Sequence, residues 1–134
     1  VLTPGTRPFS LFAWVQGGTP GQVILSQSNG EDWLLADAQN GNLKTELKGS
    51  GRRVEPLVSE TLITDGIWHH VGLVWDGAER ILYVDDVEVA RDAQPQLANA
   101  SEGLFIGAGE TLASDSFWSG LIDDVRIYDR AVVP

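Results

Sequence analysis

The stretch from Thr64 to Ala90 alternates between two sets of side chains, as a β-strand does, and is interrupted by two turns. In its first strand one face carries His69, Val71, Leu73 and Trp75, and the other carries Trp68, His70, Gly72 and Val74. Asp76-Gly77 and Asp85-Asp86 supply the turns, and Arg80–Val84 and Val87–Arg91 are the strands that follow them. The pattern predicts a three-stranded antiparallel meander.

Short apolar segments on both sides of the meander predict further strands. They are Phe9–Gln16, Gln22–Ser26, Trp33–Asp37, Leu43–Lys48, Val54–Ile63, Leu104–Gly107 and a closing segment within Phe117–Val133. No segment keeps a helical period for more than a turn or two, and the strands recur at the spacing of all-β folds. We therefore expect a two-sheet antiparallel β-sandwich or a barrel.

The closing segment breaks the period of two. Ile122, Val125 and Ile127 are the apolar positions expected in the core, but the step from Ile122 to Val125 is odd. An odd step requires a bulge or a local twist, because a strand turns every second side chain to the same face. We expect this irregularity at Asp123-Asp124.

Composition narrows the class of protein. The chain has 134 residues, 43% of them hydrophobic, which predicts a single domain over residues 1–134 with a sizeable core. A net charge of −10 disfavours nucleic acid and anionic membrane surfaces as partners, and no segment resembles a membrane span. The absence of cysteine excludes disulfides and thiolate metal sites, and the absence of methionine suggests a module of a longer protein.

Three segments together resemble the laminin G-like, concanavalin A-like jelly-roll domains. They are FSLFAWVQ at Phe9–Gln16, GIWHHVGLVWDGAERILYVDDVEVA at Gly66–Ala90 and WSGLIDDVRIYDRAV at Trp118–Val132. The resemblance implies a jelly roll, and it implies a non-catalytic module of a secreted or surface protein that binds carbohydrate. An extracellular or cell-surface location, in a bacterium, is the corresponding expectation, with other domains of the parent protein as neighbours.

The chain departs from the family pattern at three positions of these segments. Asp86 stands where glycine is usual, Gly72 where alanine is common, and Phe12 where a small or polar residue is usual.

Three aromatic residues are candidates for binding carbohydrate. Phe12 and Trp14 share the predicted non-core face of the first strand with Ser10 and Gln16, so two rings and two polar groups could receive a neutral sugar. Trp33 begins a strand beside Glu31-Asp32. Core packing is the competing interpretation for all three, and the resemblance implies core positions for Trp68 and His70.

Asp123 is the candidate metal ligand. The resemblance to laminarinases and lichenases, in which a motif like D-Y-V-R-V-Y carries a calcium-binding aspartate, implies a structural calcium ion at this position. The alternative is that Asp123 accepts hydrogen bonds from backbone N–H groups or pairs with Arg126 and binds no metal.

The sequence offers no catalytic pattern. The laminarinase-like enzymes carry E-x-D-x-E on one strand face, and no such triplet occurs here. Arg52-Arg53 could clamp an anionic sugar, but a solvated loop pair is the preferred interpretation. Asn99-Ala100-Ser101 fits a glycosylation pattern that only a eukaryotic secretory protein would use, and the absence of cysteine argues against that setting. We therefore expect a carbohydrate-binding module with a polysaccharide or glycan partner, with a protein-binding adhesion module as the alternative and a glycoside hydrolase or lyase as a remote one.

Overall fold

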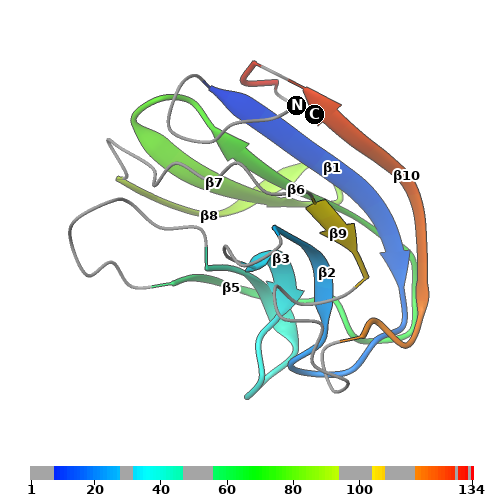
Figure 1. Cartoon of the computed structure of the whole chain (residues 1–134). Helices are drawn as coiled ribbons and strands as arrows, with labels where there is room; N and C mark the ends of the chain where they lie inside the picture. The colour runs from blue at the N-terminus through cyan, green and yellow to red at the C-terminus, as the bar shows by residue number, and fades with distance from the viewer. Residues whose placement is uncertain are drawn as a thin grey trace.

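The fold consists of two antiparallel β-sheets packed face to face, as the computed structural model shows (Figure 1). The structure describes residues 8–27, 32–46, 56–93, 104–107, 117–128, 130–132 and 134. Its strands are β1 (Phe9–Gln16), β2 (Val23–Gln27), β3 (Asp32–Ala36), β4 (Asn42–Thr45), β5 (Leu57–Leu62), β6 (His69–Trp75), β7 (Glu79–Val84), β8 (Val87–Ala93), β9 (Leu104–Ile106) and β10 (Leu121–Tyr128). The predicted all-β sandwich is confirmed.

Strand order places the first and last strands side by side. One sheet runs β10-β1-β6-β7-β8, and the other runs β5-β4-β3-β2-β9. The predicted meander is β6-β7-β8, and both Asp85 and Asp86 have positive φ, at 53° and 67°, as a type I′ turn requires. The described ranges contain no helix long and apolar enough to cross a membrane.

The main core lies between the two sheets and is built on the inner face of β1. Phe9, Leu11, Ala13 and Val15 are each 3% exposed or less, as strict alternation along the strand predicts. The Phe9 ring packs against Trp33 of the opposite sheet at 5.5 Å and against Trp75 of its own sheet at 6.3 Å. These three aromatic side chains connect the two layers.

A second apolar cluster covers the outer face of the β1-containing sheet. Its buried members are Phe12, Val74, Ile81 and Tyr83, with Tyr128 and Val132 packed against them. The ring of Phe12 lies 6.4 Å from Tyr83 and 6.3 Å from Tyr128, measured between centroids. This sheet therefore buries apolar side chains on both faces.

Phe12 and Gly72 fit each other on this outer face. They are paired residues of β1 and β6, and a Cβ atom added to Gly72 would fall 2.4 Å from Cδ1 of Phe12. Two departures from the family pattern thus compensate each other: the ring of Phe12 occupies the space that a methyl group at position 72 would need.

The predicted irregularity in the closing strand is a β-bulge. Phe12 pairs with Arg126 and Trp14 pairs with Asp123, so β10 places one extra residue opposite this part of β1. Asp124 has a positive φ of 50°. As a result both Ile122 and Val125 pack against the core, as predicted.

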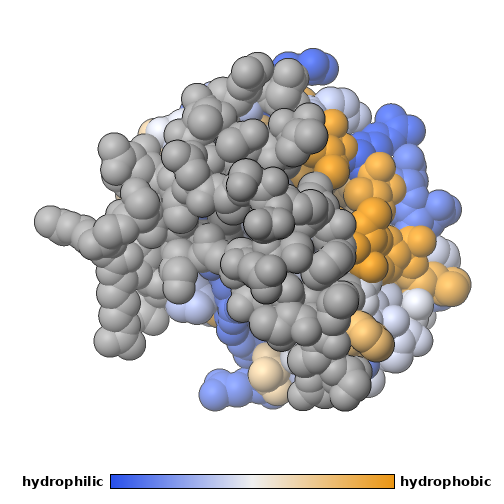
Figure 2. Space-filling view, viewed as in Figure 1, coloured by the Kyte–Doolittle hydropathy of each residue, from blue (hydrophilic) through white to orange (hydrophobic). Residues whose placement is uncertain are grey.

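The outer edge of β10 is more apolar than the sequence pattern predicts. Ile127 was expected in the core but is 41% exposed, and Leu121 is 57% exposed. The reason is position, because β10 is the edge strand of its sheet and has a neighbour on one side only. Figure 2 shows apolar side chains gathered on the side of the molecule along which β10 runs in Figure 1.

The fit between Phe12 and Gly72 predicts strong energetic coupling. Gly72→Ala should lower the free energy of unfolding by about 1–3 kcal/mol, because the new methyl group overpacks against the ring. In a Phe12→Ala background the same change should be neutral or stabilising by up to about 1 kcal/mol, since alanine costs less backbone entropy than glycine. Urea denaturation of the four proteins in this double-mutant cycle measures the coupling, and additive effects would contradict the packing described.

Candidate functional site

A shallow hollow lies at one end of the outer face, where β1, β6 and β10 meet. Its lining residues are Trp14, Trp68, Asp123 and Asp124, and its volume is about 500 Å³. Two indole rings and two carboxylates therefore face a common space. None of the other hydrophobic side chains of β1 reaches the surface at this point.

Strand register brings these residues together from distant parts of the sequence. Trp14 pairs with Asp123 on β10 and with His70 on β6, so the three side chains lie in one row across the sheet. Trp14 is 39% exposed, and its ring packs 5.0 Å from the imidazole of His70. The predicted outward orientation of Trp14 is confirmed, whereas its contact with a glycan stays a prediction.

Trp68 completes the hollow, contrary to the expectation that it is a core residue. It is 41% exposed and immediately precedes β6. The segment that carries it is held by two hydrogen bonds: the Ile67 N–H donates to Asp65 Oδ1 (3.4 Å), and Gln16 Nε2 donates to the Gly66 carbonyl (3.3 Å). Alternation along β6 had placed Trp68 on the same side as His70, and that signal was correct.

Phe12 faces outward as predicted, but it is not an open platform. It is only 4% exposed because His70 stacks on its ring at 5.5 Å and Tyr128 covers another side. Ser10 is also buried, since its hydroxyl donates to the Arg130 carbonyl (2.6 Å) and accepts from the Val132 N–H (2.8 Å). Phe12 and Ser10 therefore support the outer face from beneath.

Trp33 lies in the core and not on the surface. It is 0% exposed and packs against Phe9 between the sheets, so no ligand reaches it in this structure. Its Nε1 is buried without a hydrogen-bond partner within the described part of the chain. The sequence misled at this position because an acidic pair before a tryptophan also occurs where a buried strand begins.

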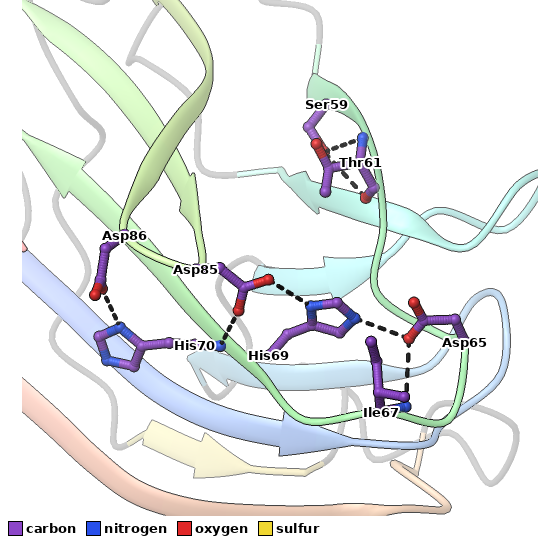
Figure 3. A network of polar contacts seen from close by, with 8 residues as sticks. All are labelled: Ser59, Thr61, Asp65, Ile67, His69, His70, Asp85 and Asp86. Carbon is purple, nitrogen blue, oxygen red and sulfur yellow. Dashed lines mark hydrogen bonds and ion pairs between the residues drawn. The ribbon is translucent and has the colours of Figure 1, made fainter.

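His69 and His70 make the polar contacts behind the hollow (Figure 3). His69 is 6% exposed and lies between Asp65 Oδ1 (2.8 Å from Nε2) and Asp85 Oδ2 (3.0 Å from Nδ1). Burial lowers the pKa of His69, but the hydrogen bonds to the two carboxylates outweigh burial and raise the pKa above the usual 6.5. His70 Nδ1 contacts Asp86 Oδ1 at 2.8 Å.

The two carboxylates of the hollow have defined local partners. Asp123 Oδ1 accepts the N–H of Asp124 (2.8 Å), and Asp124 Oδ1 accepts from Arg126 Nε (2.9 Å). The first contact matches the alternative to a metal site, in which Asp123 accepts a backbone N–H group. Arg126, however, pairs with Asp124 and not with Asp123. The residues that the structure describes contain no group of three or more His, Cys, Asp or Glu side chains placed to hold a metal ion. Calcium at Asp123 stays a prediction.

Two other sequence motifs fall outside the described residues, namely Arg52-Arg53 and Asn99-Ala100-Ser101.

The chemistry that the hollow itself offers is recognition: flat apolar rings for the C–H face of a ring-shaped ligand, and carboxylate oxygens that accept hydrogen bonds from hydroxyl groups. This mixture is typical of sites for polar, ring-containing small molecules.

Comparison with solved structures supports the fold. The binding domain of Paraclostridial Mosquitocidal Protein 1 superimposes with a TM-score of 0.74 at 13% identity over 97% of this chain. Domains LG4-5 of the mouse laminin alpha1 chain give 0.71 at 15% identity over 98%. This chain spans 36% and 40% of those two chains.

A third solved structure has a bound sugar. Domain 4 of an extracellular arabinanase from Geobacillus stearothermophilus, in complex with arabinotriose, superimposes with a TM-score of 0.56 at 19% identity. The match covers 98% of this chain and 64% of that one. At these identities the three likenesses establish the fold alone.

The family assignment comes from the whole sequence. Residues 1–134 match the laminin G family described as the concanavalin A-like lectin/glucanases superfamily. The match agrees with the two-sheet sandwich of this structure. The chain therefore belongs to the laminin G-like domains of the concanavalin A-like lectin/glucanase superfamily.

Proposed function

We propose that this domain is a non-catalytic carbohydrate-binding module whose ligand lies in the hollow between Trp14 and Trp68. The observation that carries the proposal is the exposure of these two indoles, at 39% and 41%, beside the carboxylates of Asp123 and Asp124. Exposed aromatic rings are costly in water and become favourable when an apolar ligand face covers them. Carboxylate oxygens accept the hydroxyl hydrogen bonds that orient a sugar.

Charge favours a neutral saccharide over an anionic one. Acidic residues lie in the hollow, at Asp123 and Asp124, and in the turn behind it, at Asp85 and Asp86. The chain as a whole has a net charge of −10. A uronic or sulfated sugar would therefore be repelled at short range and in the wider field of the domain.

Related proteins support a binding role in an extracellular setting. One structural neighbour is described as a binding domain, and another is a domain of an extracellular arabinanase solved with arabinotriose. We extend carbohydrate binding, and with it a secreted or surface location, to this chain as part of the proposal.

The carboxylates of the hollow are arranged as acceptors. Cleavage of a glycosidic bond requires one protonated carboxyl group and a second carboxylate on the other side of the bond. Asp123 and Asp124 are adjacent in the chain, and the Arg126 guanidinium pairs with Asp124 at 2.9 Å. Because adjacent residues of one strand do not flank a glycosidic bond from two sides, the pair is suited to accept hydrogen bonds from hydroxyl groups.

One observation favours a second function, adhesion to another protein. Leu121 and Ile127 of the edge strand β10 are exposed. Figure 2 shows apolar side chains on the side of the molecule along which this strand runs. Edge strands with apolar side chains are common sites of protein contact. This surface could serve a neighbouring domain while the hollow binds a saccharide.

The proposal predicts which substitutions abolish binding. Trp14→Ala and Trp68→Ala should each weaken binding of neutral trisaccharides at least about tenfold, equivalent to about 1.4 kcal/mol. The free energy of unfolding should fall by no more than about 1 kcal/mol, because both rings are partly exposed. Isothermal titration with arabinotriose, cellotriose, xylotriose and laminaritriose, preceded by an array of neutral, uronic and sulfated glycans, measures the effect.

Phe117→Ala is the matched control for these two variants. Phe117 is an aromatic residue that is 48% exposed and does not line the hollow, so its removal should leave binding unchanged. Equal affinity of the Trp14→Ala variant and the wild type for every glycan that binds would contradict the proposed site. Absence of binding to any glycan on the array would contradict the proposed function and favour adhesion.

The calcium prediction has a separate test. If Asp123 binds calcium, the melting temperature of the wild type should be higher in millimolar calcium than in chelator, because a ligand that binds only the folded state stabilises it. The two melting curves of Asp123→Ala should coincide, and those of Asp124→Asn should still differ. Coinciding wild-type curves would show that Asp123 accepts its backbone hydrogen bond and lines the hollow without a metal ion.

A further inference from the structure

The two walls of the hollow connect to a single turn behind it (Figure 3). His69 and His70 are adjacent on β6, so their side chains point to opposite faces of the sheet. Asp85 and Asp86 are adjacent in the turn between β7 and β8, and each carboxylate bonds one of the two imidazoles. Asp85 Oδ1 also accepts the backbone N–H of His70 at 3.1 Å.

The first connection leads from Asp86 to Trp14. Asp86 Oδ1 contacts His70 Nδ1 at 2.8 Å, which fixes the rotation of the imidazole. The fixed ring lies between two aromatic side chains, at 5.5 Å from Phe12 and 5.0 Å from Trp14. Because Phe12 is buried and held by its own neighbours, the His70 ring provides Trp14 with a firm surface on its β6 side.

The second connection leads from Asp85 to the segment that carries Trp68. His69 bonds Asp85 with Nδ1 and Asp65 with Nε2. Asp65 Oδ1 in turn accepts the N–H of Ile67, the residue before Trp68. Since ionised carboxylates only accept hydrogen bonds, both bonds of His69 form fully when both of its ring nitrogens carry a proton.

We propose that Asp85 and Asp86, acting through His69 and His70, are positioning residues that fix the two indoles of the hollow relative to each other. This inference rests on the proposed function for its effect on saccharide binding, but the positioning itself can be measured without any sugar. It also accounts for the departure at Asp86, where a glycine would form the turn but would provide no carboxylate for His70.

Asp86 offers an informative pair of substitutions. Asp86→Gly keeps a residue suited to the positive φ of 67° but removes the carboxylate, whereas Asp86→Asn keeps an oxygen that accepts from His70 Nδ1. In Asp86→Gly the nuclear Overhauser contact between the rings of Trp14 and His70 should weaken, and the indole order parameter of Trp14 should fall. Asp86→Asn should retain both, and Trp68 should be unaffected by either change.

Saccharide affinity should respond to the two Asp86 substitutions in the same way as the Trp14 ring does. For each of the four neutral trisaccharides that binds the wild type, Asp86→Gly should weaken affinity about three- to tenfold, and Asp86→Asn should stay within about twofold. Unchanged Trp14 order and unchanged affinity in Asp86→Gly would overturn the proposal. If Trp14→Ala has no effect on binding but Asp86→Gly still loosens Trp14, the positioning role is retained and the proposed function is the part that fails.

The His69 connection adds a pH profile. The titratable groups that face His69 within the described residues are Asp65, from the loop before β6, and Asp85, from the β7–β8 turn; Val15, its partner on β1, has no charge. The raised pKa of His69 means that its two bonds are complete below pH 6.5 and that one is lost as the pH rises through the raised value. Burial raises the pKa of Asp65, but the hydrogen bonds from His69 and the Ile67 N–H outweigh burial and lower the pKa below its usual value, so the carboxylate is ionised where His69 titrates.

The pH test uses the wild type and one variant. As the pH rises above 6.5, the Trp68 indole N–H resonance should shift with the same midpoint as the His69 ring signals, and trisaccharide affinity should fall about two- to fivefold. In His69→Gln the Trp68 indole resonance should not change with pH. If this variant does not fold, the test is whether the Trp68 and His69 midpoints of the wild type coincide. His70 faces Asp86 and contacts Trp14, so it serves the other wall of the hollow. If the Trp68 indole N–H resonance does not shift while His69 titrates, this part of the proposal is overturned.

Discussion

The alternation of side chains along β1 and β6 is the constraint on which both the core and the candidate site depend. These two strands lie in the middle of their sheet, so each of their residues must fit either the space between the sheets or the outer face. Phe9 and Trp75 lie on the inner face and connect the two layers, whereas Trp14 lies on the outer face, lines the hollow and packs against His70. Because the period is two, shifting either strand by one residue would exchange core and site at once.

The departures from the family pattern are explained by contacts between the residues concerned. Phe12 replaces a small residue and Gly72 makes room for its ring. The ring of Phe12 then stacks on the His70 imidazole, and Asp86 Oδ1 bonds Nδ1 of the same imidazole. Each of these residues would be unfavourable alone: a large apolar side chain on an outer face, a glycine within a strand, and an aspartate at positive φ. Together they form the packed surface against which Trp14 lies.

Much of the fold could be predicted from the sequence, because local signals decide it. Alternation located the strands, and the odd step from Ile122 to Val125 located the bulge that follows Asp123. The site was only partly predictable, because burial depends on contacts distant in the chain. Phe12 is covered by Tyr128 of the last strand, and Trp33 is enclosed by Phe9 of the opposite sheet. At Trp68 the local alternation was the better guide, and the family pattern was misleading.

The most direct measurement of the central claim is a titration of the protein with neutral trisaccharides, observed through its five tryptophan indole N–H resonances. Two tryptophans line the hollow, and Trp33, Trp75 and Trp118 are buried. A saccharide in the hollow should shift the resonances of Trp14 and Trp68 together, with one dissociation constant, and leave the other three in place. Saturable binding that leaves Trp14 and Trp68 unchanged would contradict the account.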